Sequence, residues 1–480
     1  MFSDLRSDVD VVVTGVGVTT PLGDDVPSTW AALLAGQSGI RRLDQLPAGP
    51  PDAAVRPARI GAPLLIDPGD RLGPREVDRL DRVQQAALLA AREAWADAGS
   101  PEPDPARLAV AVGTAMGGVQ TLLAEHDALR TAGAGALRRL GTPMAMAAGP
   151  AAAVSIALAA RAGTYAPASA CAAGAEALAT GVRLIRSGAA DMVLAGGAET
   201  GLLPVVLESF ARAGVLSAGG GDPRSACRPF HAGRDGCVLG EGAAMLLLER
   251  ADTAAARGAR PLARLAGAAV TSDGFHVMKP DPSGAGQRRA MLDAVADAGL
   301  SPSDIDYVHC HATGTQVGDR EEATAIAATL GEGTVVTSTK AATGHLIGAA
   351  GALAAVLTVT SIRESLIPHT INLDRPGPGI ALDVVTGKPR PAAVRTALSN
   401  AFGFGGSTCR SSSPLEPGTA QARYAPAPAG RQRTVPARLR KASASGVPGR
   451  AENTNSVWPS EAFTVRAWNC TVMTPCPTVR

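Results

Sequence analysis

The chain has 480 residues, a formal net charge of +2 and an apolar fraction of 46%. This length can hold two domains or one internally repeated domain, and the apolar fraction is sufficient for a full core. Aromatic residues make up only 3% of the chain, which argues against a stacking surface for nucleic acid. The seven cysteines include no C-x-x-C pair, which argues against a zinc site or a disulfide framework.

The N-terminus carries charges within its first ten residues, where the apolar core of a secretory signal would begin. The longest weakly polar run, Met144 to Ala160, contains Pro150 and Ser155 and is too short to span a bilayer. We therefore expect a reduced, cytoplasmic protein with no membrane partner.

A buried strand is predicted for Val9 to Gly17, V-D-V-V-V-T-G-V-G, because its β-branched run ends in glycines. Its G-V-G lacks the full dinucleotide fingerprint, so no nucleotide site is predicted. Residues 41–75 are Pro-rich and are predicted to be a surface excursion, and residues 133–150 have no clear pattern. The other elements expected in this half are helices over 30–34, 80–98 and 172–186, and strands over 108–112, 191–195 and 240–249.

A second series of elements follows in similar order. It comprises predicted strands over 263–270, 305–310, 335–338, 381–385 and 396–400, and predicted helices over 287–298, 321–330 and 344–363. Alternating strands and helices are typical of βαβ units. The repetition predicts two topologically similar α/β halves that meet near residues 250–261.

The heptapeptide A-S-A-C-A-A-G, Ala168 to Gly174, places Cys171 at a predicted strand-to-helix turn. The positive end of a helix dipole can lower the pKa of a thiol toward the thiolate range. Small neighbours would leave room for a substrate. Free cysteines are usually core residues, so this heptapeptide alone leaves a packed Cys171 and a nucleophilic Cys171 equally open.

Four downstream motifs favour the nucleophile. His311 lies in H-C-H-A-T-G-T-Q-V-G-D, at the carboxyl end of a predicted strand, where open α/β sheets bind ligands. Lys340 and His345 lie in S-T-K-A-A-T-G-H-L-I-G-A-A-G, with His345 at the start of a predicted helix. The other two motifs are N-A-F-G-F-G-G at 400–406 and R-D-G-C-V-L-G-E-G-A at 234–243.

His309 and Cys310, beside His311, have no carboxylate or second cysteine at ligand spacing, so no metal site is predicted. Taken together, the four motifs and the Cys171 turn resemble the elongating β-ketoacyl-acyl carrier protein synthases of type II (FabF-like), in the thiolase superfamily. The resemblance runs from Val9 to Gly406, about four-fifths of the chain.

The resemblance implies an α/β, thiolase-like fold, with two topologically similar halves in a five-layered α-β-α-β-α arrangement. Residues 1–255 would form the half that carries the cysteine, and residues 256–409 the half that carries the histidines and the lysine. The resemblance also implies a dimer, either with a second copy or with a chain-length factor.

The resemblance further implies roles for individual residues. Cys171 would be the acylated nucleophile, and His311 and His345 would complete a Cys-His-His triad that holds the malonyl thioester carbonyl. Lys340 and Glu322 would support the histidines through hydrogen bonds, and Asp319 would be a further supporting residue.

The backbone amides of Cys171 and Phe404 would form the oxyanion hole, and Phe404 would also gate the site. Thr313 and Thr315 match positions that contact the phosphopantetheine arm of an acyl carrier protein, which would be the partner.

The implied reaction is a decarboxylating condensation of the Cys-bound acyl group with malonyl-acyl carrier protein, in fatty-acid or type II polyketide synthesis. Such a condensation needs a sulfur nucleophile that is also a good leaving group. Two neutral histidines can donate hydrogen bonds to the enolate oxygen. No metal or dissociable cofactor is required.

The alternative is a non-catalytic partner like a chain-length factor, or an inactivated synthase. Chain-length factors usually carry Gln in place of the nucleophile, so the presence of Cys171 favours catalysis. Thiolases use a second cysteine in a C-x-G motif near the end of the chain, a pattern that Cys409 does not fit.

Residues 410–480 carry ten basic and three acidic residues and are rich in Pro, Arg, Ser and Ala without periodicity, which predicts a disordered tail. The family would place another apolar strand after Gly406, but the chain reads S-T-C-R-S-S-S-P. One set of codons for this peptide encodes H-L-S-V-V-V-A in another frame, which raises the hypothesis of a reading-frame shift near Ser407. We then expect the strand at 396–401 to become an exposed edge, with lowered stability or activity.

Overall fold

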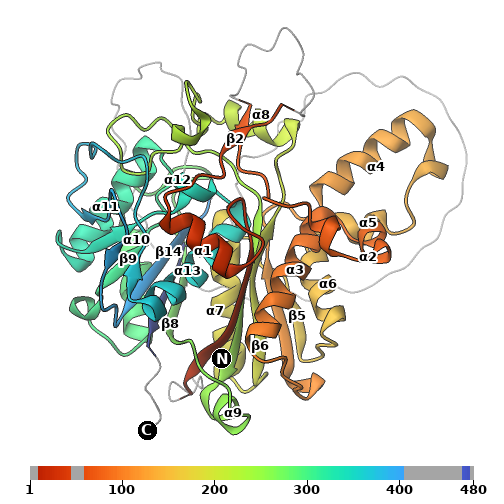
Figure 1. The fold of residues 1–480 in the computed structure, drawn as a ribbon, viewed down its shortest axis with the longest axis horizontal. Helices are drawn as coiled ribbons and strands as arrows, with labels where there is room; N and C mark the ends of the chain where they lie inside the picture. The colour runs from red at the N-terminus through yellow and green to blue at the C-terminus, as the bar shows by residue number, and fades with distance from the viewer. Residues whose placement is uncertain (1–8, 45–58, 405–467, 476–480) are drawn as a thin grey trace, which may run out of the picture. The chain divides into compact units, whose positions relative to one another are not determined.

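Eleven strands form a mixed sheet in the computed structural model, which describes residues 9–44, 59–404 and 468–475 (Figure 1). The sheet order is β12-β10-β9-β14-β15-β8-β1-β7-β6-β4-β5. The first-half strands are β1 (Val11–Thr19), β4 (Leu108–Gly113), β5 (Gly163–Tyr165), β6 (Met192–Glu199) and β7 (Gly242–Arg250). The second-half strands are β8 (Ala263–Thr271), β9 (Tyr307–His309), β10 (Val335–Thr337), β12 (Asp383–Val384), β14 (Ala397–Phe402) and β15 (Trp468–Thr474).

Both halves of the sheet follow one plan. Numbered along the chain, five strands of each half lie in the order 3-2-4-5-1, as β5-β4-β6-β7-β1 and as β10-β9-β14-β15-β8. In each half the fifth strand runs antiparallel to both of its neighbours. The halves join at β1 and β8, through the pairs Val12 with Arg264 and Val13 with Ala263. The predicted internal repetition is therefore confirmed.

Helices cover both faces of each half. Helices α3 (Arg82–Asp97) and α6 (Gly149–Ala157) pack on one face of the first-half strands, and α10 (Ala285–Asp297) and α11 (Gln316–Leu330) on one face of the second-half strands. Helices α7 (Ala173–Arg186) and α13 (Ala350–Glu364) pack against each other and against strands of both halves. The five predicted layers are thus confirmed, with α7 and α13 in the middle layer (Figure 1).

The described residues also form further helices and four two-residue strands. The helices are α1 (Val26–Leu34), α2 (Pro74–Arg79), α4 (Val119–Ala132), α5 (Gly141–Ala145), α8 (Pro204–Arg212), α9 (Ala251–Ala256) and α12 (Lys340–Thr343). The two-residue strands are β2 (Arg41–Arg42), β3 (Ile60–Gly61), β11 (Leu366–Ile367) and β13 (Arg390–Pro391). Sequence analysis did not predict α4, α6, α8 or α9.

A glycine contact between strand and helix recurs in both halves. A Cβ on Gly15 of β1 would lie 2.1 Å from the carbonyl oxygen of Ala94, and a Cβ on Gly267 of β8 would lie 2.4 Å from that of Ala294. Both distances are below van der Waals contact, so only glycine lets α3 and α10 approach their strands this closely. The helix ends also match, because Asp97 accepts the Val16 N–H and Asp297 accepts the Ala268 N–H.

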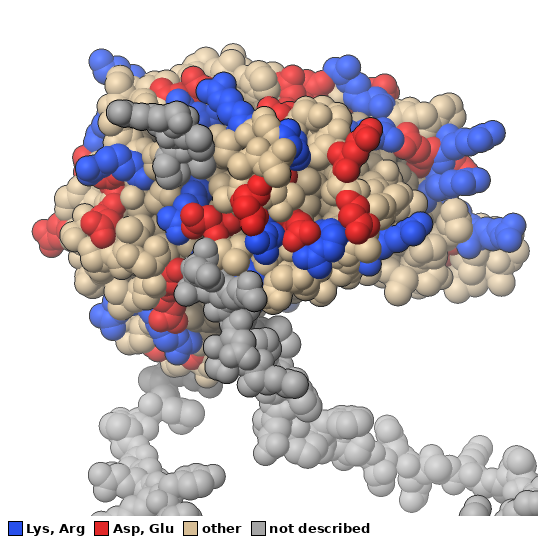
Figure 2. Space-filling view, turned by 90° about the horizontal axis from the view of Figure 1, so that it is seen from below, with Lys and Arg blue, Asp and Glu red and all other residues tan. Residues whose placement is uncertain are grey.

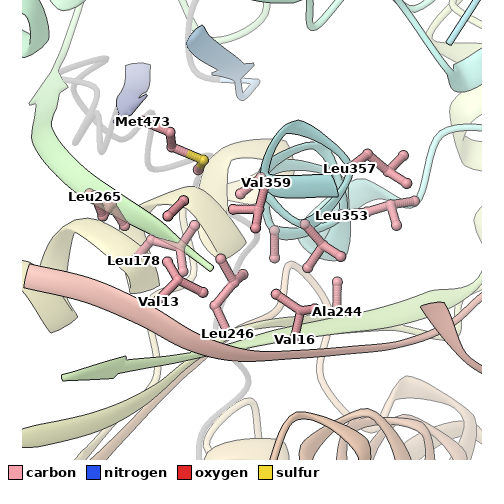
Figure 3. Packing of buried hydrophobic residues seen from close by; sticks show 14 of the residues in the cluster. Val13, Val16, Leu178, Ala244, Leu246, Leu265, Leu353, Leu357, Val359 and Met473 are labelled. Carbon is pink, nitrogen blue, oxygen red and sulfur yellow. The ribbon is translucent and has the colours of Figure 1, made fainter. Parts of the chain in front are cut away.

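The largest hydrophobic cluster lies around the middle layer and includes residues of both halves (Figure 3). Val13 and Leu246 contribute from the first-half strands and Val359 from α13, while Met473 of β15 points into the same cluster. Residues 347–364 are apolar and long enough to cross a membrane by length and composition, but 89% of this window is buried in the protein. This stretch is therefore a core segment of the described fold.

Two expectations are wrong. Residues 41–75 are not only a surface excursion, because Leu43, Ile60 and Leu64 are buried and Ala62 pairs with Gly240; the prolines obscured these apolar contacts, and residues 45–58 lie outside the described residues.

The strand predicted at 396–401 is not an exposed edge. β15 pairs with β14 on one side and with β8 on the other. Cys470, Val472 and Met473 are fully buried there. Part of the segment predicted to be a disordered tail therefore forms a central strand, and residues 405–467 and 476–480 lie outside the described residues.

Candidate active site

Cys171 lies between β5 and α7, on a single 3-10 turn, Ala170–Ala172, immediately before the first residue of α7. Ala170 adopts a φ of +52°, which is strained for a residue with a side chain. The turn directs the thiol into the protein, and only 4% of Cys171 is exposed. The predicted strand-to-helix turn is therefore confirmed.

Glycines fit the nucleophile turn against the second half. A Cβ on Gly403, just after β14, would lie 2.5 Å from the carbonyl oxygen of Ser169. A Cβ on Gly174 would lie 2.8 Å from the carbonyl oxygen of Gly348. These contacts bring the start of α7, the end of β14 and the turn before α13 together, so the nucleophile lies where the two halves meet.

His345 contacts Cys171 directly. Its Nε2 lies 3.1 Å from Cys171 Sγ. The His345 N–H donates to the Val238 carbonyl at 2.7 Å, and the Gly240 N–H donates to the His345 carbonyl at 2.9 Å. The 234–243 motif, to whose residues the sequence analysis assigned no individual roles, therefore holds the His345 backbone. The helix predicted from Gly344 begins later, because α13 starts at Ala350.

His311 follows β9, with its ring edge-on to the ring of His345 and 5.3 Å between the ring centroids. The carboxylate of Glu322 accepts the N–H groups of His311 at 2.8 Å and Ala312 at 2.6 Å. Asn400 Nδ2 also donates to this carboxylate, at 3.0 Å. Glu322 thus fixes the backbone that carries His311 rather than bonding to the imidazole.

Asp319 fixes the next residues of the same loop. Its Oδ1 accepts the N–H groups of Thr313 at 3.0 Å and Gly314 at 3.1 Å. Its Oδ2 accepts the Phe230 N–H and lies 3.7 Å from Nε of Arg234. Two buried carboxylates on the first turns of α11 therefore hold the H-A-T-G-T segment in place.

Burial determines the protonation of the triad. It raises the pKa of the Cys171 thiol to about 12, although the charge of Lys340 and the amide of Phe404 oppose this shift. Burial and the charge of Lys340 lower the pKa of His345 to about 3 and that of His311 well below its usual range. The position of Cys171 before α7 therefore does not make it a thiolate at rest, because burial disfavours the charged form.

The triad opens into a cavity of about 690 Å³, lined by Cys171, His311, His345, Thr313 and Thr315. Phe404 also lines the cavity and lies against Phe210, with 5.9 Å between ring centroids. Within the lining, the hydroxyls of Thr313 and Thr315 lie 3.2 Å apart. The predicted cavity residues therefore reach one space, which Glu322 also lines, while Lys340 and Asp319 are buried outside its lining.

Glu199 is a buried residue that sequence analysis missed. Its carboxylate, at the end of β6, accepts the N–H groups of Ala115 at 2.8 Å and Gly348 at 3.2 Å. Burial raises the pKa of Glu199 to about 7. The available signal was a carboxylate that follows the buried run A-G-G-A at the end of a predicted strand.

Across the described ranges, no group of three or more His, Cys, Asp or Glu side chains is arranged to hold a metal ion. His309 instead lies 3.3 Å from the Tyr307 hydroxyl and 3.2 Å from Thr339 Oγ1. His309 is thus a core residue with polar neighbours.

Comparison with known proteins gives two family matches. The family described as "Beta-ketoacyl synthase, N-terminal domain" matches residues 8–254, and "Beta-ketoacyl synthase, C-terminal domain" matches residues 262–374. A protein of Mycobacterium tuberculosis (strain ATCC 25618 / H37Rv), named "3-oxoacyl-[acyl-carrier-protein] synthase 2", is 46% identical over 402 residues, which are 82% of this chain and 95% of that protein.

The solved structures that match this chain include a β-ketoacyl synthase and a ketosynthase complex. The "Crystal structure of a Beta-ketoacyl synthase from Burkholderia phymatum STM815" matches with a TM-score of 0.78 and 29% identity, over 98% of this chain and 100% of that one. A second is titled "AntDE:AntF (apo): type II PKS acyl-carrier protein in complex with its ketosynthase bound to the hexaketide". It matches with a TM-score of 0.77 and 26% identity, over 98% of this chain and 100% of that one.

Proposed function

This chain belongs to the β-ketoacyl synthase family, and we propose that it is an acyltransferase that joins an acyl group on Cys171 to malonyl on an acyl carrier protein. The products are 3-oxoacyl-acyl carrier protein and CO2. The observation that carries this proposal is the 3.1 Å approach of His345 Nε2 to Cys171 Sγ, beside the ring of His311, in one cavity.

The first step loads the acyl group. Cys171 Sγ attacks the thioester carbonyl of acyl-acyl carrier protein while its proton passes to Nε2 of His345. The phosphopantetheine thiol leaves and takes that proton, so the histidine returns to its neutral form. General-base assistance is needed because burial keeps the resting thiol protonated.

The second step releases CO2 from malonyl-acyl carrier protein. The C–CO2 bond breaks, and its electron pair forms an enolate whose oxygen accepts hydrogen bonds from His311 and from Nε2 of His345, to which the ring proton of His345 has first moved from Nδ1. Both rings are neutral, because burial keeps the pKa of each far below 7. A neutral imidazole stabilises the enolate oxygen without readily protonating it, so the enolate carbon survives to attack.

The third step forms the new carbon–carbon bond. The enolate carbon attacks the Cys171 thioester, and the tetrahedral oxyanion faces the amides of Cys171 and Phe404, both of which favour negative charge at this position. The intermediate then collapses with the Cys171 sulfur leaving as a thiolate, which takes up one proton from water in the cavity and returns the resting thiol. The protein needs no metal for these steps.

The cavity rim fits the carrier arm. Thr313 and Thr315 offer hydroxyls to its amides, and the exposed Lys279 and Arg320 line the same cavity. We assign these two cations to the phosphate of the phosphopantetheine arm. Elsewhere, on the face seen in Figure 2, acidic and basic side chains are interspersed. Carrier-bound substrates of this kind support a cytoplasmic location.

The edge strand β5 supports a dimer. It pairs with β4 on one side and ends the described sheet on the other. Thr164 and Tyr165 of β5 are exposed, as is Ile156 of α6, at 81%. An unpaired strand beside an exposed apolar residue suits sheet extension by a second copy or by a chain-length-factor-like chain. Ile156→Glu should yield monomers in light scattering if this edge is the interface.

Intact-protein mass spectrometry tests the proposed function. The full chain is incubated with acyl-acyl carrier protein and then with malonyl-acyl carrier protein. We expect an acyl adduct that disappears in the second step as 3-oxoacyl-acyl carrier protein forms, and no adduct on Cys171→Ala. A folded wild-type chain that takes up no acyl group would instead support the non-catalytic alternative. We propose residues 1–255 and 256–409 as the two functional halves, with β15 (Trp468–Thr474) added to the second.

A further inference from the structure

β15 takes the same position in the second half that β7 takes in the first. β7 lies between β6 and β1, and β15 lies between β14 and β8, antiparallel to its neighbours in each case. In the first half this strand directly precedes the junction between halves. In the second half it is the last described segment, and the chain reaches it only through residues 405–467.

β15 is a central strand by burial as well as by pairing. Trp468 to Thr474 pair with Thr271 to Arg264 of β8, and Trp468 to Met473 pair with Phe402 to Ala397 of β14. Cys470 and Val472 pack in the cluster beneath α10, while Met473 packs in the cluster around α7 and α13 (Figure 3). Both faces of the strand are thus covered by helices.

Cys470 links this strand to the active site. It is the cross-strand partner of Asn400, and its thiol donates to Asn400 Oδ1 at 3.2 Å. Asn400 Nδ2 in turn donates to Glu322 Oε1 at 3.0 Å, and that same oxygen accepts the His311 N–H. Burial raises the pKa of Cys470 well above its usual range, so the thiol keeps its proton and remains a donor.

The orientation of the Asn400 amide depends on this thiol. An amide that presents its NH2 to Glu322 must present its oxygen to the opposite side, where Cys470 supplies the donor. A buried carbonyl oxygen without a donor favours rotation or displacement of the side chain. Glu322 would then lose one of its three donors, and the backbone of His311 would be held less firmly.

We propose that the segment Trp468–Thr474 is a complementing strand on which the active site depends, and that Cys470 is a positioning residue for His311, acting through Asn400 and Glu322. The second part rests on the proposed function, since it assigns His311 to the malonyl step. The first part concerns the fold alone and is tested without activity.

Hydrogen exchange of the full chain tests the strand. We expect the amides of residues 469–473 to exchange slowly, together with those of β8 and β14, because they lie inside a covered sheet. Exchange of these amides at the rate of an unstructured peptide, with β8 and β14 protected, would overturn the proposal whatever the enzyme does.

Three variants test the positioning role: Cys470→Ala, Cys470→Ser and Val472→Ala. We expect Cys470→Ala to slow decarboxylation of malonyl-acyl carrier protein about tenfold, the loss of one well-placed hydrogen bond. Acylation of Cys171, which uses His345, should change less than twofold. Cys470→Ser should restore most of the decarboxylation rate, since its hydroxyl also donates to Asn400.

Val472→Ala is the matched control, because it removes buried volume from the same cluster at a position that pairs with Leu398 rather than with Asn400. It should lower the melting temperature and slow both half-reactions equally. Equal losses in both half-reactions for Cys470→Ala, or no rescue by Cys470→Ser, would overturn the positioning role. Absence of both half-reactions in the folded wild type would contradict the proposed function instead. The exchange experiment would still test whether residues 469–473 form a protected strand.

Discussion

The two halves of the molecule share a plan but divide the chemistry. Each has the strand order 3-2-4-5-1, the glycine that lets a helix approach the first strand, and an Asp that accepts an N–H of that strand. The first half contributes Cys171 and the second contributes His311 and His345. Repeated features therefore report on folding, and features present in one half alone report on function.

The closing strand shows the limit of this comparison. β7 begins within the 234–243 motif, whose backbone hydrogen-bonds to that of His345, whereas β15 follows residues 405–467. Both strands fill the same position, because a gap between the first and fourth strands leaves two rows of buried backbone groups unpaired. The geometry of the sheet therefore demands a strand at this position, whatever its distance along the chain.

Replacing the histidines should have the largest effect. His345→Asn removes the base next to Cys171 and should slow acylation at least a hundredfold. His311→Asn should slow malonyl decarboxylation by a similar factor while acylation changes little. Rapid-quench assays of the two half-reactions measure both. His126→Asn, on the exposed face of α4, is the control, and equal losses in both half-reactions for both variants would refute the division of roles.

Substituting the glycine at the repeated strand–helix contact should have the second-largest effect. Gly15→Ala and Gly267→Ala each place a Cβ closer than 2.5 Å to a helix carbonyl oxygen, so each should lower the free energy of unfolding by about 1–3 kcal/mol or more. Gly135→Ala and Gly333→Ala, which meet nothing within 4 Å, are the controls. Thermal unfolding measures all four. If only one of Gly15→Ala and Gly267→Ala lowered the free energy of unfolding, the two glycine contacts would not be equivalent.

The paired carboxylates should give a smaller, unequal effect. Asp297 also forms an ion pair with Arg186 at 2.8 Å, whereas Asp97 faces the carboxylate of Glu93. Asp297→Asn should therefore cost about 1–2 kcal/mol, because it weakens bonds to a buried guanidinium. Asp97→Asn should change stability by less than about 0.5 kcal/mol, because a like charge is removed along with a bond. Denaturant titration at low salt measures both free energies of unfolding. Equal losses for the two variants would show that the ion pair with Arg186 does not contribute to stability.

Much of this could be predicted from sequence. The Cys171 turn, the strands that end at His311 and the alternating halves all carry local signals: small residues at a turn, apolar runs and terminal glycines. The spatial meeting of Cys171 with His345 could be expected only through the family resemblance, since 174 positions separate them.

Other features had no local signal. Trp468–Thr474 was not recognised as a strand because the sequence around it is typical of a polar tail. Its strand conformation depends on pairing with β14 and β8, which are distant in sequence. The resting state of Cys171 had no local signal either. Whether a helix start lowers a thiol pKa depends on burial, which local sequence does not reveal.

The most direct test of the shared site is the pH dependence of Cys171 alkylation by iodoacetamide, located by peptide mapping. Burial raises the pKa of Cys171 to about 12 and, with Lys340, lowers that of His345 to about 3. From pH 6 to 9 the thiol therefore stays protonated and the imidazole neutral, so general-base attack has a constant rate. An unassisted thiol in this range reacts about tenfold faster per pH unit.

We expect a flat profile for the wild type and the tenfold slope for His345→Asn. A wild-type profile that rises tenfold per unit would show that the histidine of the second half does not activate the cysteine of the first.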